Sequence, residues 1–356
     1  MPGPLKVGLV GTGSISWYHL PAYQQYPETI RLTAVCDIRR EAMEKFAEKA
    51  GVADCYIDYT EMLKKADIDA VDICTIHDQH ETQVLAAAAA GKQIFLEKPM
   101  ATSMQQCHNM VRAAEKAGVT FMIGHDLRYM PHTLAIKRVI ESGEVGQIRV
   151  TRCTLIANML PGGGYMLGHW LSDPKRAGGG MLISGMIHQI DLLRYYVGDI
   201  KSVSGVSRSV HPQMNGAEEY ACATLEFENG AIGEILIISA STQSPVGCQY
   251  TLYGDEGTIN STEAEDRTYQ FGHGMIASRR RNNTKEKYNT FTPIEPVTGH
   301  LAGDDPFVNE ILHFAACCRE GKEPLTSGRE NLGTMKTVFG IYEAFKTGKK
   351  VDLKNL

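Results

Sequence analysis

The first 124 residues alternate short apolar runs with longer helical stretches, and this alternation constrains the fold more than any other feature. Parallel strands are buried on both faces, so they appear as continuous apolar runs separated by helices. The pattern predicts an α/β domain with a doubly wound parallel sheet. Pro21 lies inside the first helical stretch and is expected to kink or end it. The predicted strands are residues 5–10, 32–36, 70–76, 93–96 and 120–123, and the predicted helices are 14–26, 41–50, 81–90 and 104–117.

The pattern changes near residue 124. Strand and turn signals dominate residues 203–259, and Asn229-Gly230 between two apolar runs predicts a hairpin. We therefore predict a doubly wound parallel-sheet domain over residues 1–124 and a second domain with helices and a large, mostly antiparallel sheet over residues 125–356. Other elements expected in the second domain are helices at 131–142, 185–196, 304–320 and 327–347 and a strand at 148–156.

Composition excludes several classes of protein. The 356 residues carry 36 Lys and Arg against 41 Asp and Glu, a formal net charge of −5, with no basic block. Nucleic acid and anionic membrane are therefore not expected partners, and no apolar run approaches the roughly 18 residues that a membrane span needs. The nine cysteines are scattered without a CxxC pair, which indicates free thiols. With no signal-peptide pattern at the N-terminus, we expect a cytoplasmic protein.

A glycine-rich turn follows the first predicted strand. Gly11-Thr12-Gly13-Ser14-Ile15-Ser16 is similar to the dinucleotide fingerprint G-x-G-x-x-G/A, with the small Ser16 at the third position. The first glycine makes the tight turn, and the second lets the backbone approach a pyrophosphate. The following helix offers its N-terminal N–H groups to the phosphates.

The second strand ends at Asp37, 21 residues after Ser16, at the spacing expected for an acid that binds the adenosine ribose. A carboxylate at this position accepts hydrogen bonds from ribose hydroxyls and repels a 2′-phosphate. NAD is therefore favoured over NADP. Arg39 and Arg40 follow closely and could instead reach a 2′-phosphate, so NADP is the less favoured alternative.

The strand at 93–96 leads into Glu97-Lys98-Pro99. Ligands bind at the carboxyl ends of strands in open α/β sheets, so Lys98 is a candidate for proton transfer there. Taken alone, Lys98 is more simply interpreted as a surface loop lysine. The bond before Pro99 is a candidate cis peptide.

Four segments together resemble the glucose–fructose oxidoreductase / inositol dehydrogenase (Gfo/Idh/MocA) family. They are residues 7–13, the stretch from Ala90-Gly91 to Glu97-Lys98-Pro99, the stretch from Gly178-Gly179-Gly180 to His188-Gln189-Ile190-Asp191, and residues 319–324. The resemblance spans nearly the whole chain. It implies a Rossmann domain, a C-terminal α+β domain whose open sheet face serves oligomer contacts, and hydride transfer between NAD(P) and a sugar, cyclitol or related polyol.

The resemblance also assigns residues. Lys98 matches the family's catalytic lysine and is expected to have its role. His188 matches the family's histidine, and Asp191 matches the acid three residues after that histidine. His188 and Asp191 share a face of the predicted helix, which permits the carboxylate to orient the imidazole. A structural role in a buried helix is the alternative; we favour function for His188 and regard the two readings of Asp191 as nearly even.

Three positions depart from the family pattern. Ser184 stands where many polyol-oxidising members carry an aspartate, so the site loses one carboxylate. Thr75-Ile76 replaces a common Thr-Pro, with Thr75 still expected under the nicotinamide end. Trp170-Leu171 replaces a frequent Trp-Arg pair.

The candidate site residues fall into a cofactor set and a substrate set, and the resemblance implies a sugar, cyclitol or related polyol as the substrate. His77, His80, His125 and His169 fit no common ligand spacing, so no metal is expected. A homodimer or homotetramer through the C-terminal sheet is expected. The cofactor candidates are Gly11, Thr12, Gly13, Ser14, Ile15, Asp37, Ile38, Arg39, Thr75, His80, Glu97 and Lys98, and the substrate candidates are Lys98, Arg128, Tyr165, His169, Trp170, Ser184 and His188.

The main hypothesis is an NAD-dependent sugar or cyclitol oxidoreductase. A second hypothesis is an enzyme that cleaves glycosides through a transient oxidation by bound NAD, which Ser184 and the unusual loop at residues 77–80 leave open. A third is an NAD-binding sensor without turnover, against which the retained Lys98 and His188 argue.

Overall fold

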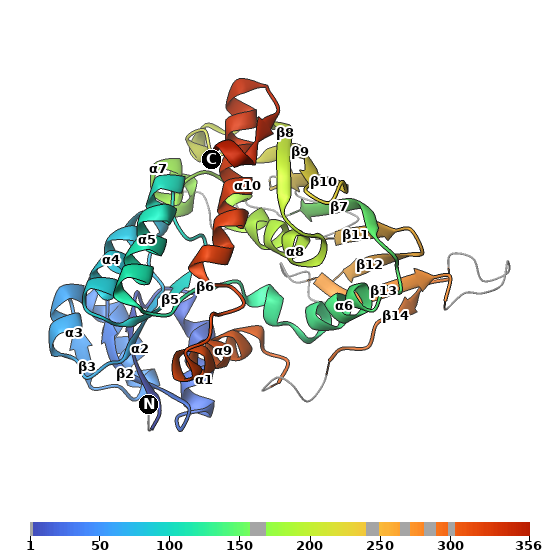
Figure 1. The fold of residues 1–356 in the computed structure, drawn as a ribbon. Coiled ribbons are helices and arrows are strands. Elements are labelled where there is room, and N and C mark those ends of the chain that lie inside the picture. Colours follow the sequence, from blue (N-terminus) through green and yellow to red (C-terminus); the bar gives the residue numbers. More distant parts are fainter. Residues whose placement is uncertain (1–2, 157–168, 240–248, 264–270, 281–289, 298–302) are drawn as a thin grey trace. The chain divides into compact units, whose positions relative to one another are not determined.

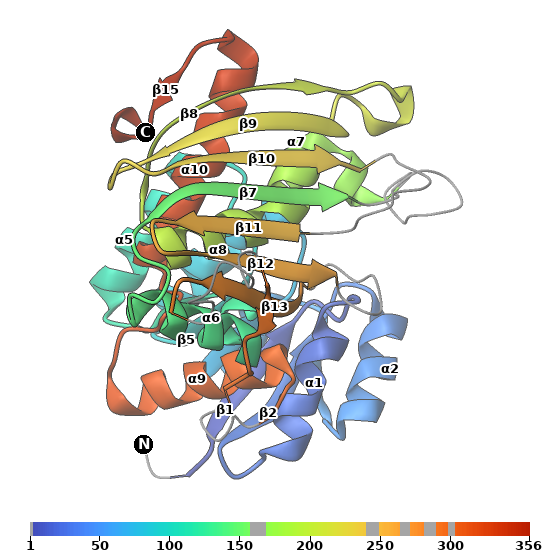
Figure 2. The same ribbon diagram turned by 90° about the vertical axis from the view of Figure 1, so that its right-hand side faces the viewer.

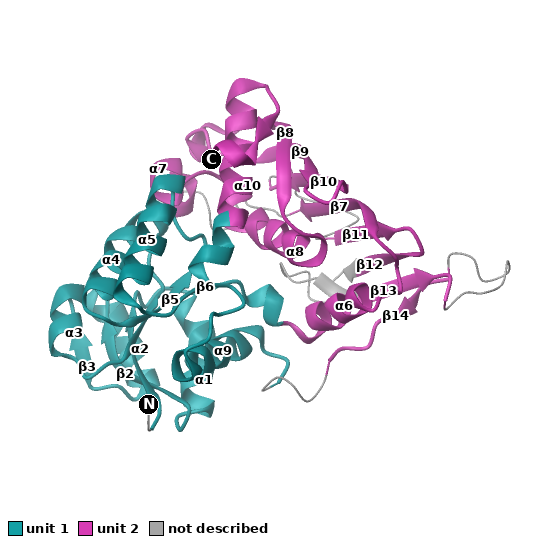
Figure 3. Cartoon of the chain, viewed as in Figure 1, with its two compact units in different colours: residues 1–129, 301–332 teal, residues 130–300, 333–356 magenta. Residues whose placement is uncertain are grey.

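A computed structural model describes residues 3–156, 169–239, 249–263, 271–280, 290–297 and 303–356. The chain forms two compact units: unit 1 is Met1–Tyr129 with Leu301–Leu332, and unit 2 is Met130–His300 with Gly333–Leu356 (Figure 3). The expected division placed a single boundary after residue 124. The structure differs because the chain returns to unit 1 near its end, where the Ile123 N–H donates to the Thr326 carbonyl at 2.9 Å.

Unit 1 contains a six-stranded sheet in the order β3-β2-β1-β4-β5-β6, with every pair parallel. This is the doubly wound Rossmann order, and it confirms the predicted fold class. Strands β2, β3, β5 and β6 of this sheet are labelled in Figure 1. The strands are β1 (Leu5–Val10), β2 (Ile30–Cys36), β3 (Asp54–Tyr56), β4 (Ala70–Ile73), β5 (Gln93–Glu97) and β6 (Phe121–Gly124). The helices are α1 (Ser16–Gln25), α2 (Arg40–Ala50), α3 (Tyr59–Lys65), α4 (His80–Ala89), α5 (Met104–Ala117) and α9 (Pro306–Glu320).

Helix α9 belongs to unit 1 although it is distant in sequence. It packs against α1 and contributes Phe314, whose ring centroid lies 5.6 Å from that of Phe95 on β5. Both rings are buried, together with Leu9 of β1. The core of unit 1 therefore includes a segment that sequence order alone assigns to the second domain.

Helix α1 continues through Pro21, so the proline does not end the helix, which was one of the two expected effects. Proline removes one backbone N–H from the helix. The neighbouring Leu20, Ala22 and Tyr23 are all buried against unit 1. Tertiary packing of this face outweighs the local cost, so the helix ends at Gln25, four residues beyond the proline.

Unit 2 is built on a nine-stranded sheet in the order β14-β13-β12-β11-β7-β10-β9-β8-β15. The β7–β10 pair is parallel and the other pairs are antiparallel, as predicted for a mostly antiparallel sheet. The strands are β7 (Ile148–Ile156), β8 (Ile200–Arg208), β9 (Tyr220–Phe227), β10 (Ile232–Ile238), β11 (Gln249–Gly254), β12 (Gly257–Glu263), β13 (Phe271–Ser278), β14 (Thr292–Pro293) and β15 (Val351–Asp352).

The helices of unit 2 lie on one face of this sheet (Figure 2). They are α6 (Pro131–Glu141), α7 (Pro174–Ala177), α8 (Ile187–Val197) and the part of α10 (Gly328–Thr347) from Gly333 onward. Within the described residues, no helix combines the length and apolar character needed to cross a membrane.

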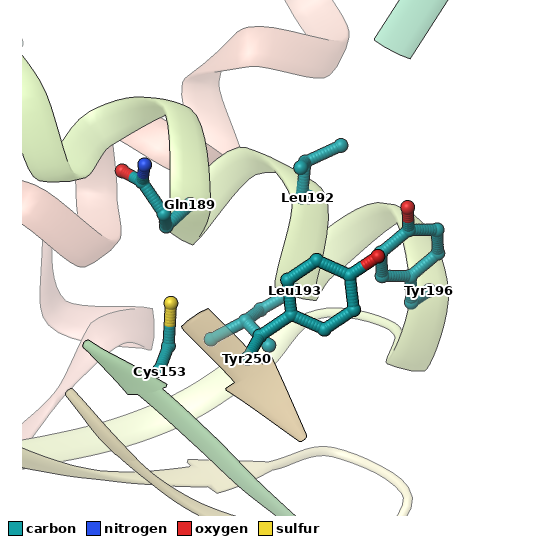
Figure 4. Close-up of a pocket in the computed structure, with 6 residues that line it drawn as sticks. All are labelled: Cys153, Gln189, Leu192, Leu193, Tyr196 and Tyr250. Atoms are coloured by element: carbon teal, nitrogen blue, oxygen red, sulfur yellow. The ribbon is translucent and has the colours of Figure 1, made fainter. Parts of the chain in front are cut away.

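Helix α8 packs its apolar side onto the sheet. Tyr196 of α8 and Tyr250 of β11 have ring centroids 5.7 Å apart, and Leu192, Leu193 and Cys153 lie beside them (Figure 4). All five residues are buried. This packing fixes the rotation of α8 about its axis, and with it the direction of the candidate residues on the same helix.

Candidate active site

The turn after β1 has the geometry that the dinucleotide fingerprint requires. Gly11 has φ +93°, and a Cβ there would lie 2.6 Å from the Cys74 carbonyl oxygen at the end of β4. Only glycine tolerates both constraints. At Gly13 a Cβ would meet no atom within 4 Å, so the backbone of the turn is open to a ligand on that side.

Asp37, which follows β2 directly, is hydrogen-bonded to this turn and to Arg39. Its Oδ2 accepts from the Thr12 N–H at 2.8 Å and the Thr12 hydroxyl at 2.9 Å, and its Oδ1 accepts from the Arg39 N–H at 2.8 Å. Burial alone would raise the pKa of Asp37, but the hydrogen bonds from Arg39 and Thr12 outweigh it and hold the pKa below its ordinary value. Asp37 is therefore an ionised acceptor at neutral pH.

The N-terminus of α1 carries no acidic residue in its first turn, and its cap residue Ile15 makes no side-chain hydrogen bond. Ser16 donates to the Gly13 carbonyl at 2.7 Å, which closes the turn on the protein side. Ser14 is exposed, and Ile38 next to Asp37 is 87% exposed. Uncapped helix N–H groups, an open glycine turn and an ionised acid fit the pyrophosphate and ribose of a dinucleotide.

His80 joins the loops that follow β4 and β5. Its Nδ1 lies 2.9 Å from the Pro99 carbonyl oxygen and its Nε2 lies 3.2 Å from the Thr75 carbonyl oxygen. Burial lowers the pKa of His80. Thr75 itself donates through its hydroxyl to Gln83 at 2.6 Å. His80 thus holds the Thr75 loop against the Lys98-Pro99 loop.

Lys98 follows β5 directly, at the carboxyl edge of the sheet, and the Lys98–Pro99 peptide bond is cis. The neighbouring Glu97 is 5% exposed. Its Oε1 lies 3.1 Å from His19 Nε2, and its Oε2 accepts from the Lys98 N–H at 3.1 Å. The sequence predicted that Glu97 binds the cofactor. The contacts of its carboxylate described here are with His19 and the Lys98 N–H, both within unit 1, and they fix the backbone of Lys98.

Arg128 lies in the interior of unit 1. Its side chain is 2% exposed and donates to both carboxylate oxygens of Glu330 at 3.1 Å, and to the Leu325 carbonyl at 3.4 Å. These contacts attach the last segment of unit 1 to η2 (Asp126–Tyr129). They give Arg128 a part in holding unit 1 together, and the substrate binding expected of it from the sequence stays a prediction.

Ser184, His188 and Asp191 belong to unit 2. Ser184 lies in a π-helical turn, Leu182–Met186, and donates to the Gly180 carbonyl at 2.8 Å. His188 is partly buried in the first turn of α8. Asp191 is 1% exposed and accepts from the Thr334 hydroxyl of α10 at 3.0 Å. The acid therefore takes part in packing α8 against α10.

Sequence reasoning missed Glu218, which anchors the turn that carries Ser184. Its carboxylate accepts from the N–H groups of Gly180 and Leu182 at 2.8 and 2.7 Å and from the Tyr342 hydroxyl at 2.9 Å. Burial raises the pKa of Glu218. A Cβ at Gly180 would lie 2.5 Å from the Glu218 carbonyl oxygen. Close packing against Glu218 thus explains why Gly180, the last residue of the Gly178-Gly179-Gly180 triplet, is a glycine.

The remaining substrate candidates lie at the edge of the described chain. His169 is exposed, and burial of part of its ring lowers its pKa. Its ring centroid lies 5.5 Å from that of Trp170. Tyr165 lies outside the described residues. Lys98 belongs to unit 1, while His169, Trp170, Ser184, His188 and Asp191 belong to unit 2.

Comparison with protein families decides the classification. Residues 5–125 match the oxidoreductase family model for the NAD-binding Rossmann fold, and residues 137–353 match the model for the C-terminal alpha/beta domain of the same family. The chain belongs to the Gfo/Idh/MocA oxidoreductase family. Its first domain is an NAD-binding Rossmann domain, as the glycine turn and Asp37 indicated.

Curated relatives cover almost the whole chain. The protein is 28% identical to D-apiose dehydrogenase of Paraburkholderia graminis over 357 residues, covering 99% of this chain and 90% of the relative. It is 25% identical to myo-inositol 2-dehydrogenase of Thermotoga maritima, covering 99% of both chains.

Solved structures share the fold at lower identity. A levoglucosan dehydrogenase in complex with NADH and levoglucosan is 23% identical, with a TM-score of 0.87 over 98% of this chain and 99% of that one. An oxidoreductase from Agrobacterium radiobacter in complex with NAD⁺, L-tartaric acid and magnesium has a TM-score of 0.84 and 23% identity, covering 99% of both chains.

Proposed function

We propose that this oxidoreductase is an NAD-dependent dehydrogenase or reductase acting on a hydroxyl or ketone of a sugar, cyclitol or related polyol. The observation that carries the proposal is the position of Lys98. Lys98 follows β5 at the carboxyl edge of the parallel sheet. The Gly11 turn, which follows β1, lies at the same edge, beside the end of β4. The names of two curated relatives, D-apiose dehydrogenase and myo-inositol 2-dehydrogenase, support the substrate class.

The chemistry divides between cofactor and protein. Bound nicotinamide supplies the hydride acceptor or donor. In the oxidative direction the Lys98 amine accepts the proton of the reacting hydroxyl, and His188 is a second proton-exchanging group. Ser184, which replaces a carboxylate, contributes hydrogen bonding without charge. Asp191 helps to orient α8 through its hydrogen bond with Thr334.

NAD is the proposed cofactor in preference to NADP. Asp37 is ionised, and its carboxylate would repel a 2′-phosphate. The Arg39 guanidinium donates to Asp37 at 3.2 and 3.1 Å, so its charge is directed at the carboxylate. This arrangement disfavours the alternative in which Arg39 binds the phosphate of NADP.

The test is absorbance at 340 nm with the purified protein, NAD or NADP, and a panel of aldoses, inositols and aryl glycosides. NADH formation with one polyol class, or NADH consumption with the matching ketone, supports the proposal. Release of free sugar from a glycoside without net NADH would instead support the glycoside-cleaving cycle. Tight NADH binding with no reaction on any compound would support the sensor.

An oligomer through the open face of the unit 2 sheet is part of the proposal. Val206, Cys222 and Leu236 lie in register on β8, β9 and β10 and are exposed. Ile232, further along β10, is 55% exposed. Such an apolar row on a sheet is suited to covering by a second copy. Light scattering of the wild type and of Leu236→Lys measures this: a dimer or tetramer that dissociates in the variant is expected, and a monomeric wild type would refute it.

A further inference from the structure

A cluster of titratable side chains lies inside unit 1 and includes Glu97 of the Glu97-Lys98-Pro99 segment. Its members come from five elements: α1, β4, β5, η2 and α9. Each is 6% exposed or less, and none besides Glu97 was expected to serve the site. The members are His19, Asp72, Glu97, Asp126 and Glu310.

His19 is held between two carboxylates. Its Nδ1 lies 2.9 Å from Asp72 Oδ2, and its Nε2 lies 3.1 Å from Glu97 Oε1. Only a doubly protonated imidazolium donates at both nitrogens. Burial alone would lower the pKa of His19, but the Asp72 carboxylate and Cys74 outweigh it and place the pKa well above its ordinary value. Tyr23 donates to Asp72 at 2.7 Å from the other side.

The hydrogen bonds continue from His19 to the backbone of the candidate catalytic lysine. Glu97 Oε1 faces His19, and Glu97 Oε2 accepts from the Lys98 N–H. A Cβ at Gly124 of β6 would lie 2.9 Å from Glu97 Oε1, so a larger residue at this position would crowd the carboxylate. The carboxylate of Glu97 is therefore held by His19 at one oxygen and by the Lys98 N–H at the other.

Glu310 of α9 brings the number of carboxyl groups in the cluster to four, with Asp72, Glu97 and Asp126. It is 0% exposed, and within the described residues neither of its oxygens has a hydrogen-bond partner. Burial, together with the charges of Asp126 and Glu97, raises the pKa of Glu310 well above its ordinary value, against the opposing charge of His19. Burial and the charge of Glu97 likewise raise the pKa of Asp126 to about 7, although Lys98 opposes the shift. Glu310 is accordingly a neutral acid at neutral pH.

We propose that His19 is a positioning residue for Lys98: its ring, held by Asp72, fixes the Glu97 carboxylate that holds the Lys98 backbone. The inference rests on the proposed role of Lys98 in proton transfer. The proposal identifies His19 as a group that acts on Lys98 from the buried interior of unit 1.

A bound cation is the competing interpretation of the same residues. Ligand atoms of His19, Glu97 and Glu310 lie within 4.8 Å of one another, and Asp72 could orient the imidazole from behind. Coordination would require a neutral His19 and an ionised Glu310, the reverse of both protonation states inferred here. The two interpretations therefore predict opposite results for the same variants.

The first experiment compares His19→Gln with Tyr23→Phe. Tyr23→Phe removes a hydrogen bond from Asp72 but leaves Glu97 untouched, so it controls for loss of cluster stability. We expect His19→Gln to lower kcat by about tenfold or more, with the Kd for NADH nearly unchanged. Its pH profile of kcat should shift toward higher pH, because a positive charge beside Glu97 and Lys98 is removed. Equal kcat values and pH profiles in the two variants would overturn the proposal.

The second experiment uses Glu310→Gln, which mimics the neutral acid. The groups that face Glu310 are His19 and Tyr23 of α1, Asp72 of β4, Glu97 of β5, and Asp126 and Tyr129 of η2. The native state keeps the Glu310 proton to a higher pH than the unfolded state does, so this residue costs stability as pH rises above about 4.5. We expect Glu310→Gln to retain kcat within about twofold and to melt at the same or a higher temperature than wild type at pH 8.

Metal analysis of the wild type and Glu310→Gln completes the test. A stoichiometric metal that is lost together with stability in Glu310→Gln would overturn the proposal in favour of a cation site. Failure of the proposed function is separate: it would appear as a fully active Lys98→Met variant. If Lys98→Met is inactive but His19→Gln and Tyr23→Phe have the same kcat and pH profile, only the positioning role of His19 is refuted.

Discussion

The N–H and the hydroxyl of Thr12 both donate to the same oxygen of Asp37, at 2.8 and 2.9 Å. This contact joins the glycine turn after β1 to the end of β2, across 25 residues of sequence. The glycine turn, which would bind the pyrophosphate, is therefore hydrogen-bonded directly to Asp37, which would bind the ribose. Changes at Asp37 should affect the turn as well as cofactor choice.

Replacing Asp37 with Ser tests cofactor preference. The variant loses the ionised acceptor for the ribose hydroxyls and the repulsion of a 2′-phosphate, so its Kd for NADH should rise by about tenfold, while binding of NADPH should improve. Fluorescence titration with both nucleotides measures this. Glu28→Gln, at the opposite end of β2 with an exposed side chain, is the matched control. An unchanged NADH-to-NADPH ratio in Asp37→Ser would contradict the assignment of Asp37.

Alanine at Gly11 and at Gly13 should have different effects. Gly11→Ala forces a Cβ to 2.6 Å from the Cys74 carbonyl oxygen at φ +93°, so we expect a loss of about 1–3 kcal/mol in the free energy of unfolding. Gly13→Ala meets no protein atom and should melt like wild type while binding NADH about tenfold more weakly. Denaturation and NADH titration of both variants check this. Normal NADH binding by Gly13→Ala would remove the glycine turn from the cofactor site.

Glu218 should matter more for the turn that carries Ser184 than Tyr342 does. Glu218→Gln replaces one carboxylate oxygen by an NH2 group that then faces a backbone N–H donor, and it should cost about 1–3 kcal/mol of unfolding free energy. Tyr342→Phe removes one of the three hydrogen bonds and should cost about 1 kcal/mol. Urea denaturation gives both values. A larger loss in Tyr342→Phe would mean that the hydroxyl, rather than the carboxylate, holds the turn.

Asp191 and His188 can be separated by their kinetics. Because Asp191 accepts from Thr334 and is 1% exposed, Asp191→Asn should lower the melting temperature and leave the pH profile of kcat unchanged. His188→Asn should fold normally and change that profile. Wild-type stability in Asp191→Asn together with an altered pH profile would make the acid a participant in proton transfer.

The sequence predicted the local parts of this protein well. The helix at 104–117 and the strand at 148–156 have the expected bounds, because their periodicity and flanking residues are local signals. The fingerprint and Asp37 were recognised because their spacing is a property of one strand–helix–strand unit.

Long-range contacts were not predicted. The return of α9 to unit 1 and the anchoring of the glycine triplet by Glu218 join residues far apart in sequence, and no periodicity reports them. One local signal was available: Asp72 is a charged residue inside the apolar strand β4, and a buried charge requires a partner. That partner, His19, comes from the middle of α1, where nothing in the sequence marks it as charged.

The central claim is that Lys98 transfers the substrate proton in an NAD-dependent oxidation or reduction. Its most direct test is the rate of change in absorbance at 340 nm for wild type, Lys98→Met and the exposed control Lys116→Met, with NADH binding measured on the same samples. We predict turnover of one polyol class by wild type and Lys116→Met, and a loss of about a hundredfold or more in Lys98→Met with NADH binding intact. Wild-type turnover in Lys98→Met would contradict the account.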